Sequence, residues 1–121
     1  MTVLILGVHL ELGRYRTEFL KSHGIGVIFP ETQASAFAAI PKGGFDVVIL
    51  SYSLSNQTAR ELVELLEQSH PNCPIIAITE KRWHDQELRP DATVLASDPP
   101  QSLLEAINRV GGRRSGIRRI K

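Results

Sequence analysis

The segment Phe45–Ser51, which reads Phe-Asp-Val-Val-Ile-Leu-Ser, decides the fold class. Its four consecutive apolar residues are mostly β-branched, a run long enough for a strand buried on both faces and too short for a stable helix. Similar runs occur at Val3–Leu6, Val27–Phe29 and Ile75–Ile78, and Thr93–Leu95 is a weaker fifth strand. Strand signals therefore recur along the whole chain.

Segments with helical periodicity separate these strands. The clearest has apolar residues at i, i+3, i+4 and i+7, namely Ala59, Leu62, Val63 and Leu66. The pattern Thr58-Ala-Arg-Glu61 reads as a capping box at the start of this helix, and Pro71 follows its end.

Three further helices are predicted from shorter apolar patterns. The first carries Tyr15, Phe19 and Leu20 and ends near His23-Gly24, the second carries Phe37 and Ile40 and ends before Pro41, and the last carries Leu103, Leu104, Ile107 and Val110. The segment Trp83–Leu88 allows at most a short helix, because Arg89-Pro90 interrupts it.

The resulting alternation of strands and helices predicts one α/β domain. Short connections between strands of this kind favour a doubly wound, five-stranded parallel sheet with right-handed crossovers and helices on both faces, which makes three layers. Ligand chemistry is then expected at the carboxyl ends of the strands. We place the domain at residues 1–110 and predict a basic, flexible tail or linker at residues 111–121.

Composition is that of a folded cytoplasmic protein. The chain has 121 residues, 42% hydrophobic and 22% charged, which suits one globular domain. The apolar start, Met1–Leu10, has no preceding basic residue and ends at Glu11, so it resembles neither a secretion signal nor a membrane span. The single cysteine, Cys73, is expected to be a buried structural thiol at the head of a strand.

Charge is distributed unevenly along the chain. Residues 1–110 hold nine basic and thirteen acidic residues, whereas the tail holds five basic residues and no acid: Arg113, Arg114, Arg118, Arg119 and Lys121. Nucleic-acid binding is therefore not expected except through these five residues. The tail also contains three glycines and no aromatic residue, which favours a linker.

The predicted strand ends carry few groups for chemistry. The first strand is followed by Gly7, Val8 and His9, with Gly13 further on, which matches neither a dinucleotide fingerprint nor a phosphate-binding loop. The third and fourth strands end in hydroxyl residues, Ser51 and Thr79. Two hydroxyl groups are thus expected to face the crevice.

Five βα units, the third strand Phe-Asp-Val-Val-Ile-Leu and the fourth strand Pro-Ile-Ile-x-Ile-Thr together resemble the receiver domains of response regulators. The resemblance covers about residues 2–110 and implies a flavodoxin-like sheet with strand order 2-1-3-4-5. It also implies a role in two-component signalling, with a kinase or an output domain as the protein partner. Whether the chain forms a homodimer is left open.

The resemblance further assigns family positions to residues of this chain. The acid pair that binds magnesium falls on Gly7 and Val8, or on Val8 and His9 after a shift of one residue, and the phosphorylated aspartate falls on Ser51. The threonine is present as Thr79, while the lysine is missing from Ala96–Asp98. A hard cation needs oxygen ligands and phosphoryl transfer needs charge compensation. We therefore predict a degenerate pseudo-receiver without aspartyl phosphorylation, magnesium, other cofactors or enzymatic activity.

Other chemical roles for these residues are less well supported. Asp46 precedes the third strand and belongs to the opposite edge of the sheet, so it is not expected to replace the acceptor. Ser51 has no placed base to activate it, and His9 with Glu11 and Glu80 is a weaker hypothesis than a polar loop contact. Trp83 is a candidate interface residue, with a core position as the alternative.

Two alternative functions remain beside the signalling module. One is a small ligand-binding or enzymatic flavodoxin-like domain that uses Ser51, Thr79 and His9. The other is a DNA-associated regulator that acts through its basic tail.

Overall fold

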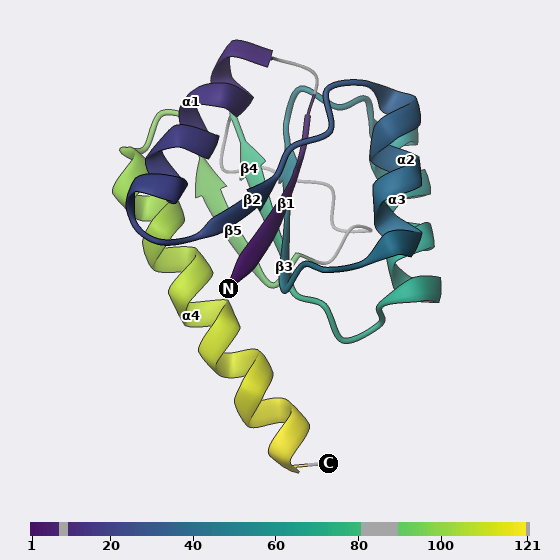
Figure 1. Ribbon diagram of the computed structural model, residues 1–121, viewed down its shortest axis with the longest axis vertical. Coiled ribbons are helices and arrows are strands. Elements are labelled where there is room, and N and C mark those ends of the chain that lie inside the picture. Colours follow the sequence, from purple (N-terminus) through teal and green to yellow (C-terminus); the bar gives the residue numbers. More distant parts are fainter. Residues whose placement is uncertain (8–9, 81–89, 121) are drawn as a thin grey trace.

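A computed structural model describes the backbone of residues 1–7, 10–80 and 90–120 and the side chains of these residues up to Gly111. The described residues form five strands in one parallel sheet of order β2-β1-β3-β4-β5 (Figure 1). The strands are β1 (Thr2–Leu6), β2 (Gly26–Ile28), β3 (Val47–Ser51), β4 (Ile75–Thr79) and β5 (Ala92–Leu95). The predicted doubly wound parallel sheet and its strand order are confirmed.

Four described helices cover the sheet: α1 (Leu10–Ser22), α2 (Gln33–Lys42), α3 (Asn56–Ser69) and α4 (Pro100–Ile120). Helices α1 and α4 lie on one face, and α2 and α3 lie on the other (Figure 1). The short helix predicted at residues 83–88 lies outside the described residues.

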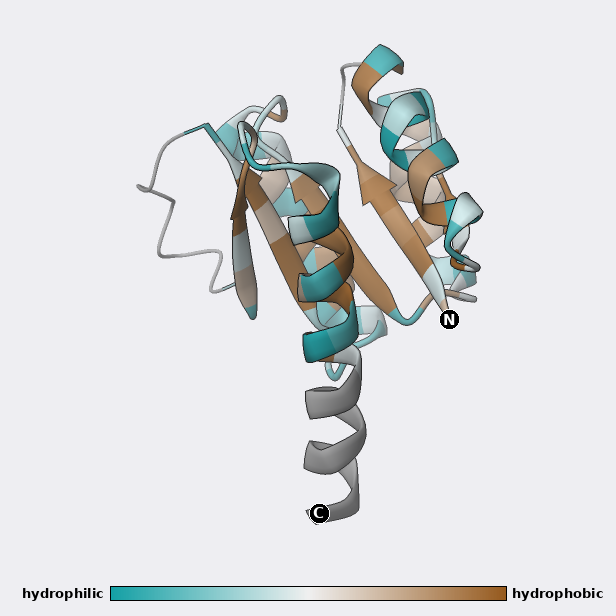
Figure 2. Ribbon diagram, turned by 90° about the vertical axis from the view of Figure 1, so that its left-hand side faces the viewer, coloured by the Kyte–Doolittle hydropathy of each residue, from teal (hydrophilic) through white to brown (hydrophobic). Residues whose placement is uncertain are grey.

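Strand residues alternate between the two faces. On β1, Val3 and Ile5 belong to the core under α1 and α4, whereas Leu4 and Leu6 belong to the core under α2 and α3. Figure 2, which looks onto the sheet from the side of α1 and α4, shows the strands mostly in brown. Burial of β1, β3 and β4 on both faces explains why these three segments appear as continuous apolar runs, whereas the outer strands β2 and β5 are only partly buried.

Two helix boundaries differ from the sequence prediction. Helix α3 is capped by Ser55, whose hydroxyl accepts a hydrogen bond from the Thr58 amide at 3.2 Å, so the predicted capping box at Thr58 is wrong. Ser55 is an equally good cap and lies earlier in the chain. Helix α2 continues through Pro41 to Lys42, because a proline near the end of a helix disrupts little of the hydrogen-bond ladder.

Helix α1 approaches β2 through Gly13. A β-carbon at Gly13 would lie 2.1 Å from the Phe29 ring, so the absence of a side chain lets the helix and Phe29 pack. The Tyr15 side chain, which the periodicity placed among core residues, is 56% exposed, while Leu20 is fully buried. The helix therefore packs through Gly13 and Leu20 with Tyr15 facing outward.

Two aspartates join neighbouring strands at the amino edge of the sheet. The Asp46 carboxylate accepts a hydrogen bond from the Thr2 amide at 2.9 Å, and the Asp46 amide donates to the Thr2 carbonyl at 2.7 Å. Asp91 makes the same pair of bonds with Ile75, at 2.8 and 2.7 Å. We call these two reciprocal pairs the aspartate clasps. Asp46 thus lies at the opposite edge of the sheet from Ser51, as we predicted from its position one strand length before Ser51.

The first residue of the chain contacts the middle of helix α4. Met1 lies against Gly111, where an added β-carbon would come within 2.4 Å of the Met1 methyl group. Helix α4 runs past residue 110 to Ile120 and beyond the end of the sheet (Figure 1), whereas we predicted its last periodic residue to be Val110. The division into a domain and a tail stays a prediction.

Two smaller points complete the description. Cys73 is partly exposed, so the expectation of a buried thiol is wrong, and its sulfur lies 3.8 Å from the Pro74 carbonyl oxygen. No helix within the described ranges is both long and apolar enough to cross a membrane.

Candidate functional site

Gly7 and Ser51 lie side by side at the carboxyl edge of the sheet. Leu6 of β1 pairs with Leu50 of β3, so Gly7, which follows β1, and Ser51, the last residue of β3, come into contact. A β-carbon at Gly7 would lie 2.8 Å from the Ser51 β-carbon and 3.3 Å from its hydroxyl oxygen. The space into which a side chain at Gly7 would extend is therefore already occupied by Ser51.

Ser51 is held by hydrogen bonds within its own loop. Its side chain is only 7% exposed, and its hydroxyl oxygen accepts bonds from the Ser53 amide at 3.3 Å and the Ser53 hydroxyl at 3.1 Å. The Leu54 amide donates to the Ser51 carbonyl at 3.1 Å, which closes the turn before α3. Ser51 is thus a satisfied, neutral group at this edge.

Thr79 ends β4 at the same edge, one strand further along. It pairs with Leu95 of β5, and the Thr79 carbonyl accepts a hydrogen bond from the Ala96 amide at 2.7 Å. In the following loop, the Asp98 carboxylate accepts a bond from the Leu95 amide at 3.1 Å. Asp98 therefore closes the β5–α4 connection, in the segment where the resemblance expected a lysine.

Several predicted site residues lie outside the described residues, namely Val8, His9 and Trp83. Glu80, named with His9 as a metal ligand, is exposed. Within the described part of the chain, no three histidine, cysteine, aspartate or glutamate side chains lie together in a metal-binding arrangement. The structure thus brings Gly7 and Ser51 together and places Thr79 on the adjacent strand.

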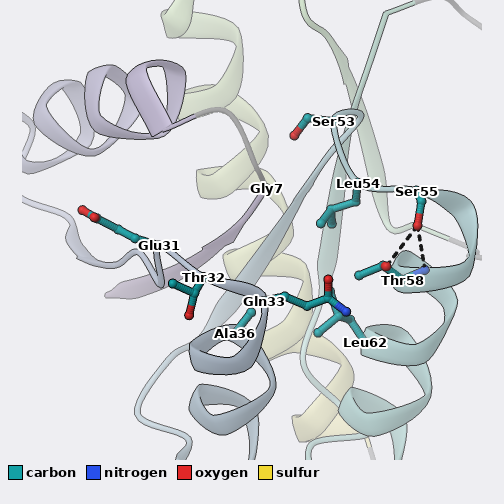
Figure 3. A pocket seen from close by; sticks show the side chains of 10 residues that line it. All are labelled: Gly7, Glu31, Thr32, Gln33, Ala36, Ser53, Leu54, Ser55, Thr58 and Leu62. Atoms are coloured by element: carbon teal, nitrogen blue, oxygen red, sulfur yellow. Dashed lines mark hydrogen bonds between the residues drawn. The ribbon is translucent and has the colours of Figure 1, made fainter.

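A pocket of about 340 Å³ opens beside the Gly7–Ser51 contact, and we call it the switch-point pocket (Figure 3). It is lined by ten residues: Gly7, Glu31, Thr32, Gln33, Ala36, Ser53, Leu54, Ser55, Thr58 and Leu62. Only one of them, Glu31, carries a charge. Neither Ser51 nor Thr79, which the ligand-binding alternative invoked, is among the lining residues.

On the other face, a small pocket of about 80 Å³ separates α1 from the β5–α4 loop. Leu12 and Tyr15 of α1 lie on one side of it, and Pro99 and Pro100 lie on the other. The Leu12 and Tyr15 side chains are 38% and 56% exposed. This part of α1 therefore presents apolar and aromatic surface to solvent.

Arg16, also at this pocket, is half-buried. Burial lowers the pKa of its guanidinium group below the ordinary value, and the nearby Tyr52 acts in the opposite direction. Arginine stays charged over the whole working pH range. Arg16 therefore provides a fixed positive charge close to Tyr52, the residue after Ser51.

Sequence reasoning missed Ser53, Ser55 and Gln33. The alternation Ser51-Tyr52-Ser53-Leu54-Ser55 after a predicted strand was an available signal for Ser53 and Ser55. Gln33 carried no such signal, because its position at the pocket depends on how the β2–α2 loop meets the β3–α3 loop.

Solved structures similar to this chain include receiver domains and response regulators. A CheY-like receiver from Methanospirillum hungatei has a TM-score of 0.80 at 20% identity, over 95% of this chain and 96% of that one. The response regulator TrrA from Thermotoga maritima, solved with Mg²⁺ and BeF, has a TM-score of 0.77 at 19% identity, over 90% and 97%. NtrX from Brucella abortus has a TM-score of 0.83 at 15% identity, over 98% of this chain and 28% of NtrX.

No protein-family model and no curated protein sequence matches the chain. The structural likeness spans nearly its whole length and agrees with the strand order and the two helical layers described above. The chain therefore has the fold of the receiver domains of two-component response regulators.

Proposed function

We propose that this chain is a receiver-like signalling module that acts through protein contacts, without aspartyl phosphorylation or magnesium binding. The observation that carries the proposal is the Gly7–Ser51 contact. At the positions where a receiver needs an acidic ligand and an acidic acceptor, this chain has a residue without a side chain and a serine.

The residues present do not fit a magnesium ion. Mg²⁺ favours carboxylate oxygens in octahedral geometry. Gly7 supplies no side-chain oxygen, and the Ser51 hydroxyl is already bonded by Ser53. A phosphoryl group at Ser51 would lack the metal that offsets its charge. No phosphoryl-transfer step is therefore derived for this site.

A kinase or an output domain is the proposed kind of partner. The exposed side chain of Tyr15, with Leu12 beside it, supports a contact on α1, since aromatic side chains are favoured at interfaces. The interface role predicted for Trp83 concerns a residue outside the described part of the chain and stays a prediction.

Titration of amide NMR spectra with magnesium and beryllofluoride tests the proposal. We expect no saturable shifts at Gly7, Ser51 or Thr79. TrrA from Thermotoga maritima, whose structure holds Mg²⁺ and BeF, is the positive control under the same conditions. Saturable shifts at these three amides would contradict the proposal.

A further inference from the structure

The switch-point pocket lies where the order of the sheet reverses. From β1 the chain crosses to β2 on one side, and from β2 it returns past β1 to β3 on the other. Open parallel α/β sheets form a crevice at this point, outside the carboxyl ends of the strands, and ligands bind there. Gly7 follows β1 and Ser53 follows β3, and both line the pocket. The pocket therefore lies at the place where this topology makes a binding site.

The inner wall of the pocket is apolar. Ala36 of α2 and Leu62 of α3 are buried, and Leu54 of the loop before α3 is partly buried. Figure 3 shows Ala36 and Leu62 on facing helices, with Leu54 above them. These side chains provide a surface against which the apolar face of a ligand can pack.

The remaining lining groups are mostly uncharged and form hydrogen bonds. Thr32 and Ser55 cap α2 and α3, and Ser55 and Thr58 are joined by a hydroxyl–hydroxyl bond of 3.0 Å. The Gln33 carboxamide extends from α2 toward α3 in Figure 3. Hydroxyl and amide groups of this kind both donate and accept hydrogen bonds, so they match the hydroxyl groups of a ligand.

The one charged lining residue points away from the pocket. The Glu31 carboxylate accepts a hydrogen bond from the Arg14 guanidinium at 3.3 Å, and Figure 3 shows Glu31 directed away from the other side chains. The ten lining residues include no lysine or arginine that could offset a phosphate. Charge therefore argues against a nucleotide and against a metal ion.

We propose that the switch-point pocket binds an uncharged, hydroxyl-rich small molecule of about monosaccharide size. The volume of about 340 Å³ is near the lower end of the range found for ligand pockets, roughly 300–1,000 Å³. Gln33 and Thr58 supply polar contacts, and Leu54 and Leu62 supply the apolar wall. This inference goes beyond the proposed function and does not depend on it.

The test is amide NMR titration of the full chain with four neutral probes, glucose, ribose, myo-inositol and glycerol, and with glucose 6-phosphate as a charged probe. We expect saturable shifts with at least one neutral probe, confined to Gly7 and residues 31–36 and 53–62. If no neutral probe binds, or if the charged probe binds more tightly than glucose, the proposal is wrong.

Two variants locate the binding site. Gln33→Leu removes the carboxamide at an exposed position, and Gln68→Leu makes the same change on an exposed part of α3 that does not line the pocket. We expect Gln33→Leu to weaken binding roughly fivefold, the loss of one neutral hydrogen bond. Gln68→Leu should bind like the unmodified chain. Equal affinities for all three proteins would overturn the assignment.

Discussion

The starts of β3 and β5 each carry an aspartate, whereas the contact between the ends of β1 and β3 has no acidic residue. At the amino edge, the aspartate clasps tie β3 to β1 and β5 to β4 through carboxylates that accept backbone amides. At the carboxyl edge, Gly7 and Ser51 meet without any carboxylate between them. Asp46 and Asp91 thus stabilise strand starts, and the contact between the ends of β1 and β3, where the resemblance expects acidic chemistry, is made by two uncharged residues.

The largest loss of stability is expected when an acid is introduced at the carboxyl edge. In Ser51→Asp, burial of the carboxylate raises its pKa above the unfolded value of about 3.9, since the site is only 7% exposed. The variant should lose stability as the pH rises above that value, and the loss in free energy of unfolding should reach roughly 2–4 kcal/mol at pH 8. Urea unfolding at pH 4 and pH 8 measures the difference.

The same variant should not be phosphorylated by acetyl phosphate with magnesium, because the acceptor returns without metal ligands or lysine. Ser51→Ala is the control for loss of the hydroxyl alone. Stable magnesium-dependent phosphorylation, or a stability that does not fall with pH, would show that the edge accommodates an acid.

A smaller loss of stability is expected from Gly7→Asp, which places a side chain against Ser51. The 2.8 Å approach of the two β-carbons forces a backbone shift and costs about 1–3 kcal/mol. Adding Ser51→Gly removes one of the two β-carbons and should recover part of this loss. A double-mutant cycle in urea unfolding measures the coupling, and additive effects would mean that the two positions do not touch.

The reverse change tests the amino edge. Asp46→Ala removes the carboxylate that accepts the Thr2 amide and should cost about 1–2 kcal/mol, since an acceptor is lost at a partly buried site. Asp46→Asn keeps an acceptor oxygen and should lose much less. If both variants unfold at the same urea concentration, the hydrogen bond is not what Asp46 contributes.

The sequence predicted the sheet well because its physical signal is local. The three inner strands are buried on both faces, so each appears as a short, continuous run of apolar residues, and the alternation of runs and helices selects a parallel sheet covered on both faces. The strand order and the roles assigned to Gly7 and Ser51 came from the resemblance to receiver domains and not from the pattern of strands and helices. Tyr15 was misplaced because Gly13, which has no side chain to mark it as apolar, makes the close contact of α1.

The switch-point pocket could not be predicted in the same way. It forms where the ends of β1, β2 and β3 meet the first turns of two helices, so its lining residues come from separate parts of the chain. The N-cap of α3 could not be predicted either, because several residues of a loop rich in serine and threonine can cap a helix, and Ser55 and Thr58 both fit the pattern.

The smallest effect is expected from removing the end of α4. Truncation after Gly112 keeps the contact between Met1 and Gly111 and should change the melting temperature by no more than about 2 °C, a shift that corresponds to less than 1 kcal/mol. Among the side chains that the structure describes, which end at Gly111, Val110 is the last one of α4 that packs in the core. A large loss of thermal stability, or conversion of a dimer to a monomer, would make the segment an integral element instead of a linker.

The central position of β1 also affects how the chain folds during synthesis. Because β1 lies between β2 and β3, one of its edges stays unpaired until the ribosome has produced residue 51, and an unpaired apolar edge favours aggregation. The core face beneath α4 is completed only when Leu103, Ile107 and Val110 emerge. Nascent chains that stop before Val110 should therefore depend on chaperones, since chains shorter than 51 residues leave an edge of β1 unpaired and longer ones still leave one face of the sheet partly open.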